Sequence, residues 1–124
     1  MIKMVFCVRR RSDLPEEEFY KYWLQKHGPL VKSQTSALKI RRYVQSHTAL
    51  DDLGATVREG RGMKLPDFDG LAEVWWDSYQ DLMSALESQE GQKASVLLAE
   101  DEARFIDMEA STIFFTEEHV VVDS

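Results

Sequence analysis

The sequence predicts an α+β protein of ferredoxin-like topology, with a four-stranded antiparallel sheet and its helices on one face. The predicted elements follow the order strand–helix–strand, strand–helix–strand (βαββαβ), which is typical of the split βαβ arrangement. The chain has 124 residues, a length that fits one domain with its own core. It contains no linker or low-complexity tract, so we expect a single domain over residues 1–124.

The first strand is expected at residues 2–10, where the apolar run "IKMVFCV" ends in charged residues. A helix start follows directly. Asp13 can act as the N-cap, and Glu16 stands three residues later, as in a capping box. Pro15 is tolerated in the first helical turn.

The first helix carries an apolar stripe that includes a histidine. Phe19, Trp23 and His27 are spaced by four residues, which places them on one helix face. The Gly-Pro pair at residues 28–29 is expected to break or kink the helix. We expect the helix to continue beyond it to about residue 37.

The second strand is expected at residues 38–50, where Tyr43, Gln45 and His47 share one face. Residues 51–68 contain three glycines and a proline and show no core pattern. A connection of that length is typical of a functional or disordered loop.

The second half repeats the order of the first. "GLAEVWW" predicts a strand, a cap at Asp77 or Ser78 starts a helix, and a second short helix and a final strand follow. The expected elements are strand 70–76, a helix to about residue 88, helix 91–103 and strand 105–116.

The last two strands are apolar on both sides, since Trp75 adjoins Trp76 and residues 113–115 read Ile-Phe-Phe. Two helices can cover only one face of a small sheet, and large apolar patches are seldom left in water. We therefore expect an obligate homodimer, in which two sheets enclose a barrel-like interior that holds the binding cavity.

The charge balance is acidic, with 15 basic and 22 acidic residues and a net charge of −7. This balance argues against nucleic acid or an anionic membrane as partner. The single cysteine, Cys7, excludes an internal disulfide and suits a reducing compartment. With no secretory or transmembrane pattern, a cytoplasmic protein is expected.

Three motifs resemble one known family. "LPEEEFYKYWLQKHGPLV" resembles the helix of EthD-like proteins, in which an acidic start and an aromatic pair precede a His-Gly-Pro end. "DGLAEVWWDS" with "LMSALES", and then "LLAEDEARFID", resemble the second half of that family. The resemblance implies a dimeric α+β barrel of ferredoxin-like topology. It does not choose a chemistry, because relatives on this fold include isomerases, cyclases, dehydratases, cofactor-free oxygenases and haem-degrading enzymes.

His27 is the first candidate site residue. An unperturbed imidazole titrates near pH ~6.5, so the ring could act as a general acid or base. A helix C-terminus would favour the charged ring, whereas burial would favour the neutral one. The alternative is a structural histidine that bonds the last helical carbonyls.

Tyr43, Gln45 and His47 form the second candidate group. If their face points inward, it is a polar wall in an apolar cavity, as in many small-molecule sites. If it points outward, it is a solvated strand face, and a register shift of one residue would invert the two. Relatives of the family commonly use a histidine or tyrosine from this strand, so we favour the inward orientation.

Glu73, Trp75 and Trp23 complete the candidate site as substrate-binding residues. A carboxylate in an apolar strand is either reactive or paired with an arginine such as Arg9 or Arg41, and pairing is the preferred interpretation. Trp75 and Trp76 should point to opposite sheet faces. Aromatic rings suit a flat substrate, although core packing is the default for tryptophan.

We therefore expect a cofactor-independent enzyme that catalyses isomerisation, dehydration or cyclisation of a small, hydrophobic, ring-containing carbonyl compound. His27 would be the chief acid/base group, with Tyr43 and His47 polarising an oxygen. One alternative is a non-catalytic binding protein of an oxygenase-type degradation pathway. Another is a haem-linked or cofactor-free oxidoreductase, since one axial histidine suffices for haem. No metal site and no phosphate-binding loop are expected.

Overall fold

The computed structural model describes residues 1–124, and its four strands form one antiparallel sheet in the order β2-β3-β1-β4. The strands are β1 (Ile2–Val8), β2 (Arg42–His47), β3 (Gly70–Trp76) and β4 (Thr112–Glu117). This strand order is that of a ferredoxin-like sheet, so the predicted α+β class and βαββαβ topology are confirmed.

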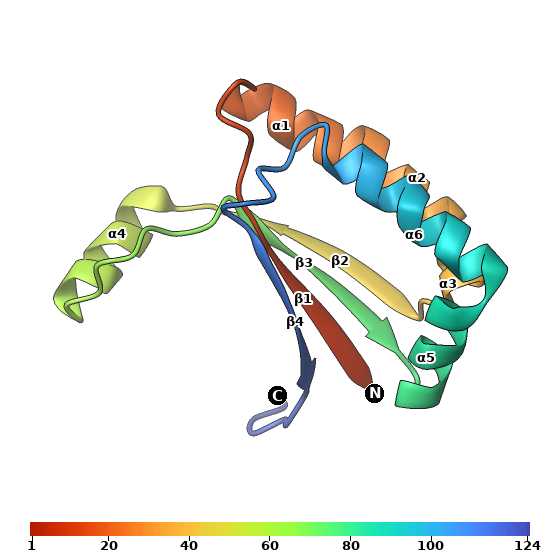
Figure 1. Cartoon of the computed structure of the whole chain (residues 1–124). Helices are drawn as coiled ribbons and strands as arrows, with labels where there is room; N and C mark the ends of the chain where they lie inside the picture. Colours follow the sequence, from red (N-terminus) through yellow and green to blue (C-terminus); the bar gives the residue numbers. More distant parts are fainter.

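Two helical segments cover one face of the sheet (Figure 1). The first consists of α1 (Glu16–Tyr22), the π-helical turn η1 (Trp23–His27), α2 (Gly28–Ser33) and α3 (Thr35–Leu38). The second consists of α5 (Tyr79–Glu87) and α6 (Gln89–Glu102). The remaining helix, α4 (Asp51–Gly60), stands away from both layers on the other side of the sheet.

The first helical segment differs from the prediction at its start. Asp13 does not cap it, because its carboxylate binds the Arg11 guanidinium at 2.7 Å, and the helix starts at Glu16. The expected break or kink at Gly28 and Pro29 takes the form of a change from the π-helical turn η1 to α2, and the helical segment continues to Leu38, close to the expected end near residue 37. In η1 the wider turn joins the Gly28 N–H to the Trp23 carbonyl, so Pro29 begins a new α-helical turn that needs no N–H from it.

The expected strand at 38–50 is shorter, because α3 occupies its start and ends at Lys39 in the left-handed conformation (φ 55°). Residues 51–68 were expected to be a loop, but their first half forms α4. None of the side chains of α4 is buried, which explains why no core pattern marks it.

The second half follows the prediction more closely. Strand 70–76 is confirmed, and Ser78 caps α5 by accepting the Asp81 N–H at 3.0 Å. The last strand starts at Thr112 instead of residue 105, because Phe105 and the residue after it turn into the core.

The core lies between the sheet and the helices. It is built from seven buried side chains: Phe6, Val8, Phe19, Trp23, Ala72, Phe105 and Ile106. Gly70 permits this packing, since a Cβ there would lie 2.8 Å from the Trp23 ring and 2.4 Å from the Ser46 carbonyl oxygen. The first helix can therefore approach the sheet closely at this point.

The helix-free face of the sheet is mixed in character, and is less apolar than expected from the composition of the last two strands. At its centre Lys3 and Glu73 form an ion pair of 2.8 Å. The Trp75 ring lies beside them, with the cations of Lys3 and Arg42 within 5.4 Å and 4.9 Å of its centroid. No helix in the structure combines the length and apolar character needed to cross a bilayer.

Candidate functional site

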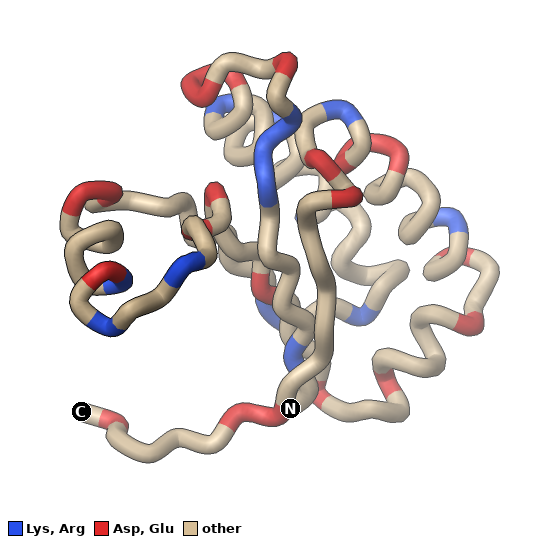
Figure 2. Tube along the Cα trace, turned by 60° about the vertical axis from the view of Figure 1, so that its left-hand side comes forward, with Lys and Arg blue, Asp and Glu red and all other residues tan.

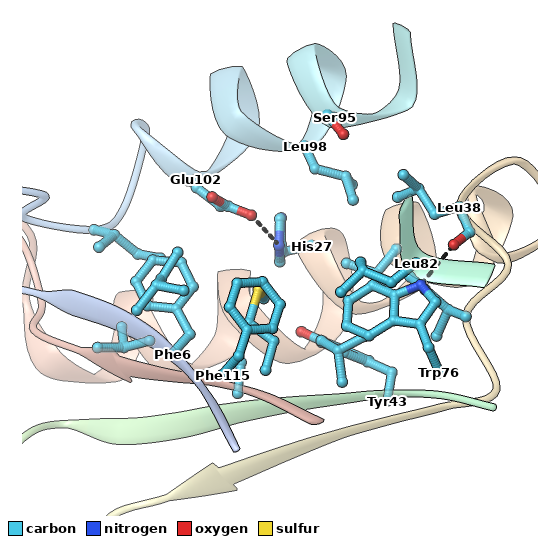
Figure 3. Close-up of a pocket in the computed structure, with 18 of the residues that line it drawn as sticks. Phe6, His27, Leu38, Tyr43, Trp76, Leu82, Ser95, Leu98, Glu102 and Phe115 are labelled. Atoms are coloured by element: carbon cyan, nitrogen blue, oxygen red, sulfur yellow. Dashed lines mark hydrogen bonds and ion pairs between the residues drawn. The ribbon is translucent and has the colours of Figure 1, made fainter. Parts of the chain in front are cut away.

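The main cavity lies inside one chain, between the sheet and the helices that cover it (Figure 3). Its volume is about 200 Å³, and 17 of the 20 side chains that line it are hydrophobic. The polar ones are His27, Ser95 and Glu102, to which the hydroxyl of Tyr43 adds a fourth polar group. This cavity differs from the one expected between two facing sheets: it lies within one chain, because the space under the helices is not completely filled by side chains.

His27 enters the cavity from η1 and is 3% exposed. Its Nδ1 lies 2.7 Å from Oδ2 of Asp101. Because a carboxylate can only accept, the Nδ1 atom carries the hydrogen, and Nε2 of the neutral ring keeps its lone pair. The imidazole ring is thus held in one tautomer, in which the basic nitrogen Nε2 points away from Asp101.

Glu102 faces that basic nitrogen, with its Oε2 atom 3.7 Å from Nε2 of His27. Burial raises the pKa of Glu102 to about 7, and the nearby charge of Asp101 adds to this effect. Burial lowers the pKa of His27 and outweighs the opposing effect of the hydrogen bond that His27 donates to Asp101. Near neutral pH, a neutral imidazole therefore faces a carboxyl group that is about half protonated.

The helix continues past His27, so the C-terminal dipole that would have favoured a charged ring is not present there. Burial alone sets the direction in which the His27 pKa moves from its ordinary value. The alternative of a histidine that bonds the last helical carbonyls does not apply, because its Nδ1 bonds the Asp101 side chain.

Asp101 and Glu102 are the site residues that sequence reasoning missed. Both lie at the end of α6, and no basic residue stands in the last turn of that helix. Acidic groups at a helix C-terminus oppose the helix dipole, and this signal could have singled them out in "LLAEDEA". Asp101 is in turn fixed by the Tyr22 hydroxyl, which donates to its Oδ1 at 2.5 Å.

Tyr43 lines the cavity from β2, and its hydroxyl points towards the space below His27 (Figure 3). Its oxygen accepts a hydrogen bond of 2.9 Å from Nε2 of Gln45. Burial raises the pKa of Tyr43, so the phenol keeps its proton at neutral pH. Tyr43 can therefore donate to a ligand oxygen.

Gln45 and His47 share the helix-side face with Tyr43, but neither lines the cavity. Gln45 donates to the Trp23 carbonyl at 2.8 Å. His47 stacks on the rings of Trp23 and Tyr20, at centroid distances of 4.6 Å and 5.0 Å. Gln45, predicted as a substrate contact, and His47, predicted as a catalytic residue, are therefore engaged by the backbone and the side chain of Trp23, respectively.

Trp23 lines the cavity, as expected of a substrate-binding residue, whereas Glu73 and Trp75 lie on the helix-free face and do not. Strand alternation separates Trp75 from Trp76, which does line the cavity. Glu73 is paired as predicted, but with Lys3 and not with an arginine, since Lys3 comes from the adjacent strand β1. No group of three or more His, Cys, Asp or Glu side chains is arranged to hold a metal ion.

The family follows from comparison with known proteins. The model of the EthD domain matches residues 11–109. The chain belongs to the EthD domain family. The resemblance drawn from its three motifs is thereby confirmed.

Solved structures share the fold of this EthD-domain chain. An EthD family protein from Bacillus halodurans is 17% identical, with 96% of this chain and 99% of that chain covered and a TM-score of 0.64. An EthD-like protein from Ralstonia eutropha is 17% identical, with coverages of 99% and 95% and a TM-score of 0.57. A dimeric protein of unknown function and ferredoxin-like fold from Bacteroides fragilis is 12% identical, with coverages of 94% and 95% and a TM-score of 0.58. No curated protein matches the chain.

Proposed function

We propose that this EthD-domain protein is a cofactor-independent enzyme that moves a proton on a small, apolar, ring-containing carbonyl compound. One observation carries the proposal: His27 and Glu102 form an acid/base pair that faces a predominantly apolar cavity. Burial raises the pKa of Glu102 to about 7 and lowers that of His27, so near neutral pH the pair holds a carboxylic acid beside a neutral imidazole base, the combination that general acid–base catalysis requires.

The cavity supports a ligand with a single ring. An engineered apolar cavity of about 150 Å³ binds benzene, so a volume of about 200 Å³ accommodates a somewhat larger molecule. The hydrophobic lining favours an uncharged ligand, and the carboxylates at the end of α6 disfavour an anion. A neutral cyclic ketone or enone meets both conditions.

The proposed reaction begins with proton abstraction by His27. Its Nε2 takes a proton from the carbon next to the ligand carbonyl, and the C–H electron pair forms an enolate. Asp101 stabilises the imidazolium, and the Tyr43 hydroxyl donates to the enolate oxygen. Protonation at another atom by the Glu102 carboxylic acid gives an isomer, after which His27 returns its proton to Glu102. Dehydration or cyclisation would start from the same enolate.

The test is proton exchange on cyclohexanone in D₂O, followed by NMR. The wild-type protein should accelerate replacement of the hydrogens next to the carbonyl, and His27→Asn should reduce this acceleration by about 10²–10⁴-fold. His119→Asn, in the exposed C-terminal tail, is the matched control and should exchange like wild type. Full exchange activity in His27→Asn would refute the assignment of the base.

A second candidate is a non-catalytic binding protein of an oxygenase-type pathway. The predominantly apolar lining supports it, since such a cavity binds a hydrophobic compound without any proton transfer. Ligand-induced shifts of cavity resonances, together with no acceleration of cyclohexanone exchange, would favour this candidate over the enzyme.

Haem fits the site poorly. A cavity of about 200 Å³ is far smaller than a haem macrocycle requires, and both ring nitrogens of His27 face carboxylates. We derive no step through haem.

Oxidation without a cofactor would use the same cavity, with His27 again abstracting the proton before oxygen reacts with the carbanion.

A homodimer is also part of the proposal. The helix-free face balances two cations, Lys3 and Arg42, against two anions, Glu73 and Glu118, so it would not repel a second copy of an otherwise acidic chain. Phe114, which alternates onto this face, is 47% exposed. The Bacteroides fragilis relative is described as dimeric.

The arm formed by α4 supports the same arrangement. Figures 1 and 2 show α4 and the C-terminal tail extending to the helix-free side of the sheet. Leu53 and Val57, one helical turn apart on α4, are 57% and 44% exposed. A ten-residue helix is marginal without tertiary packing, so a second copy that packs on this face would cover it. We also propose a cytoplasmic location, since Cys7 is a free thiol.

A further inference from the structure

The side-chain amide of Gln45 bonds two parts of the candidate site: Trp23, in the turn that carries His27, and Tyr43, on β2. Its Nε2 donates to the Trp23 carbonyl at 2.8 Å and to the Tyr43 hydroxyl at 2.9 Å. Its Oε1 lies 2.9 Å from Nε2 of His47. Gln45 thus contacts the turn that carries His27 and the residue that faces His27 across the cavity, although it lines neither the cavity floor nor its walls.

The orientation of this amide is fixed by its partners. The Trp23 carbonyl can only accept, so it must face the NH₂ group, which leaves Oε1 facing His47. Nε2 of His47 is therefore the donor, and it remains one whether the ring is neutral or charged. The stacking of His47 on the rings of Trp23 and Tyr20 holds this donor in place.

The Trp23 carbonyl belongs to the π-helical turn. In an α-helix it would accept the N–H of residue 27, but here it accepts the N–H of Gly28 and the side chain of Gln45. Gly28 lies next to the amide, since a Cβ there would be in van der Waals contact with Nε2 of Gln45 at 3.4 Å. Reversion of this turn to α-helix would shift the helical register by one residue, or about 100°, and would turn His27 away from Asp101.

The same amide sets the direction of the Tyr43 hydroxyl. Because the NH₂ group of Gln45 can only donate, the Tyr43 oxygen accepts from it. The phenolic proton makes no hydrogen bond to the protein and is free to point into the cavity. Without Gln45, the hydroxyl could rotate and offer its proton elsewhere.

We propose that Gln45 is the positioning residue of this site: it holds the π-helical turn that presents His27 and aims the Tyr43 hydroxyl proton at the ligand oxygen. This inference rests on the proposed function for its catalytic consequence. Its structural part can be tested without any ligand.

The primary test is NMR of the ligand-free protein labelled with ¹⁵N-histidine. The chain has three histidines, so single His→Asn variants assign the signals. Wild type should show a slowly exchanging Nδ1–H signal from His27, bound to Asp101. Gln45→Met is nearly isosteric but has no donor, and it should lose this signal. Ser46→Ala, the exposed neighbour on the opposite face, should keep it.

A residue that only stabilises the fold would lower the melting temperature and leave the His27 signal intact, and that result would overturn the proposal. If Gln45→Met does not fold, Gln45→Asn provides the test, since the shorter amide cannot reach both Trp23 and Tyr43. It should lose the His27 signal while it remains folded, and retention of the signal would overturn the proposal.

Cyclohexanone exchange separates this inference from the proposed function. In Gln45→Met, kcat for exchange should fall by about 10²-fold, with little change in KM. If wild type fails to exchange the ketone but the His27 signal still depends on Gln45, the proposed function fails and the positioning role stands. If wild type exchanges it and Gln45→Met behaves in the same way, the function stands and the positioning role is overturned.

Discussion

Replacing Glu102 by glutamine should change the dependence of stability on pH. The pKa of Glu102 in the folded protein is about 7, against an ordinary value of 4.5. Between these values the folded protein keeps a proton that the unfolded chain has released. Folding therefore becomes less favourable as the pH rises through this interval, by about 1.4 kcal/mol per pH unit.

The interval is 7 − 4.5, or about 2.5 pH units, so ionised Glu102 costs the folded state about 3 kcal/mol above neutral pH. The glutamine side chain of the Glu102→Gln variant stays neutral at every pH, so the variant should not lose this stability above neutral pH. At pH 8 the variant should be more stable than wild type by up to about 3 kcal/mol, or roughly 10 °C in melting temperature. At pH 4.5 the two proteins should be equally stable.

His27 acts in the opposite direction. Burial lowers the pKa of His27, so the folded protein stays neutral where the unfolded chain takes up a proton, and this histidine reduces stability as the pH falls below about 6.5. Both proteins contain His27, so its contribution cancels in the difference between variant and wild type. The difference in unfolding free energy between variant and wild type therefore measures the titration of Glu102, which the wild-type curve alone does not.

Urea denaturation at half-unit steps from pH 4.5 to 8 measures this difference. Glu100→Gln, on the exposed surface of the same helix, is the control for loss of a negative charge. A difference between Glu102→Gln and wild type that stays constant over the whole range would mean that Glu102 titrates normally. The assignment of Glu102 as the acid at neutral pH would then fail.

Two further predictions concern packing and assembly. Trp76→Phe should lower the free energy of unfolding by about 1–3 kcal/mol, because the Leu38 carbonyl would lose its buried 2.7 Å donor. The control is Trp75→Phe, whose hydrogen-bond partner Glu118 lies on the exposed tail. It should lose less unfolding free energy in the same urea titration. Leu53→Asp should raise the Kd of the homodimer at least tenfold in sedimentation experiments. Val96→Asp, at a position equally exposed (57%) on α6, should leave the Kd unchanged, and equal behaviour of the two variants would refute the role of α4.

Local sequence signals were sufficient for the order of the four strands and of the helices that cover the sheet, but not for α4. The run at 70–76 has the length and composition of a buried strand, and Ser78 has the residue type and position of an N-cap. Such features depend on neighbours within a few positions. The ferredoxin-like topology then follows from element order, because few topologies accommodate two βαβ halves.

The site was only partly predictable because its key contacts join distant positions. The π-helical turn depends on Gln45, 22 residues beyond Trp23, and helical periodicity cannot reveal a partner on a strand. Asp101 meets His27 across 74 positions. The face of Trp75 and Glu73 could not be assigned either, because one shift of register exchanges the two sides of a strand.

The cavity is lined by side chains of a single chain, and this has a consequence for any assembly. Each copy in a homodimer would contain a complete cavity, so an inactive copy would not lower the activity of its partner. A mixed population of intact and inactivated chains should lose turnover in simple proportion to the inactivated share. Natural variation could then remodel the contact between copies without disturbing the chemistry inside either one.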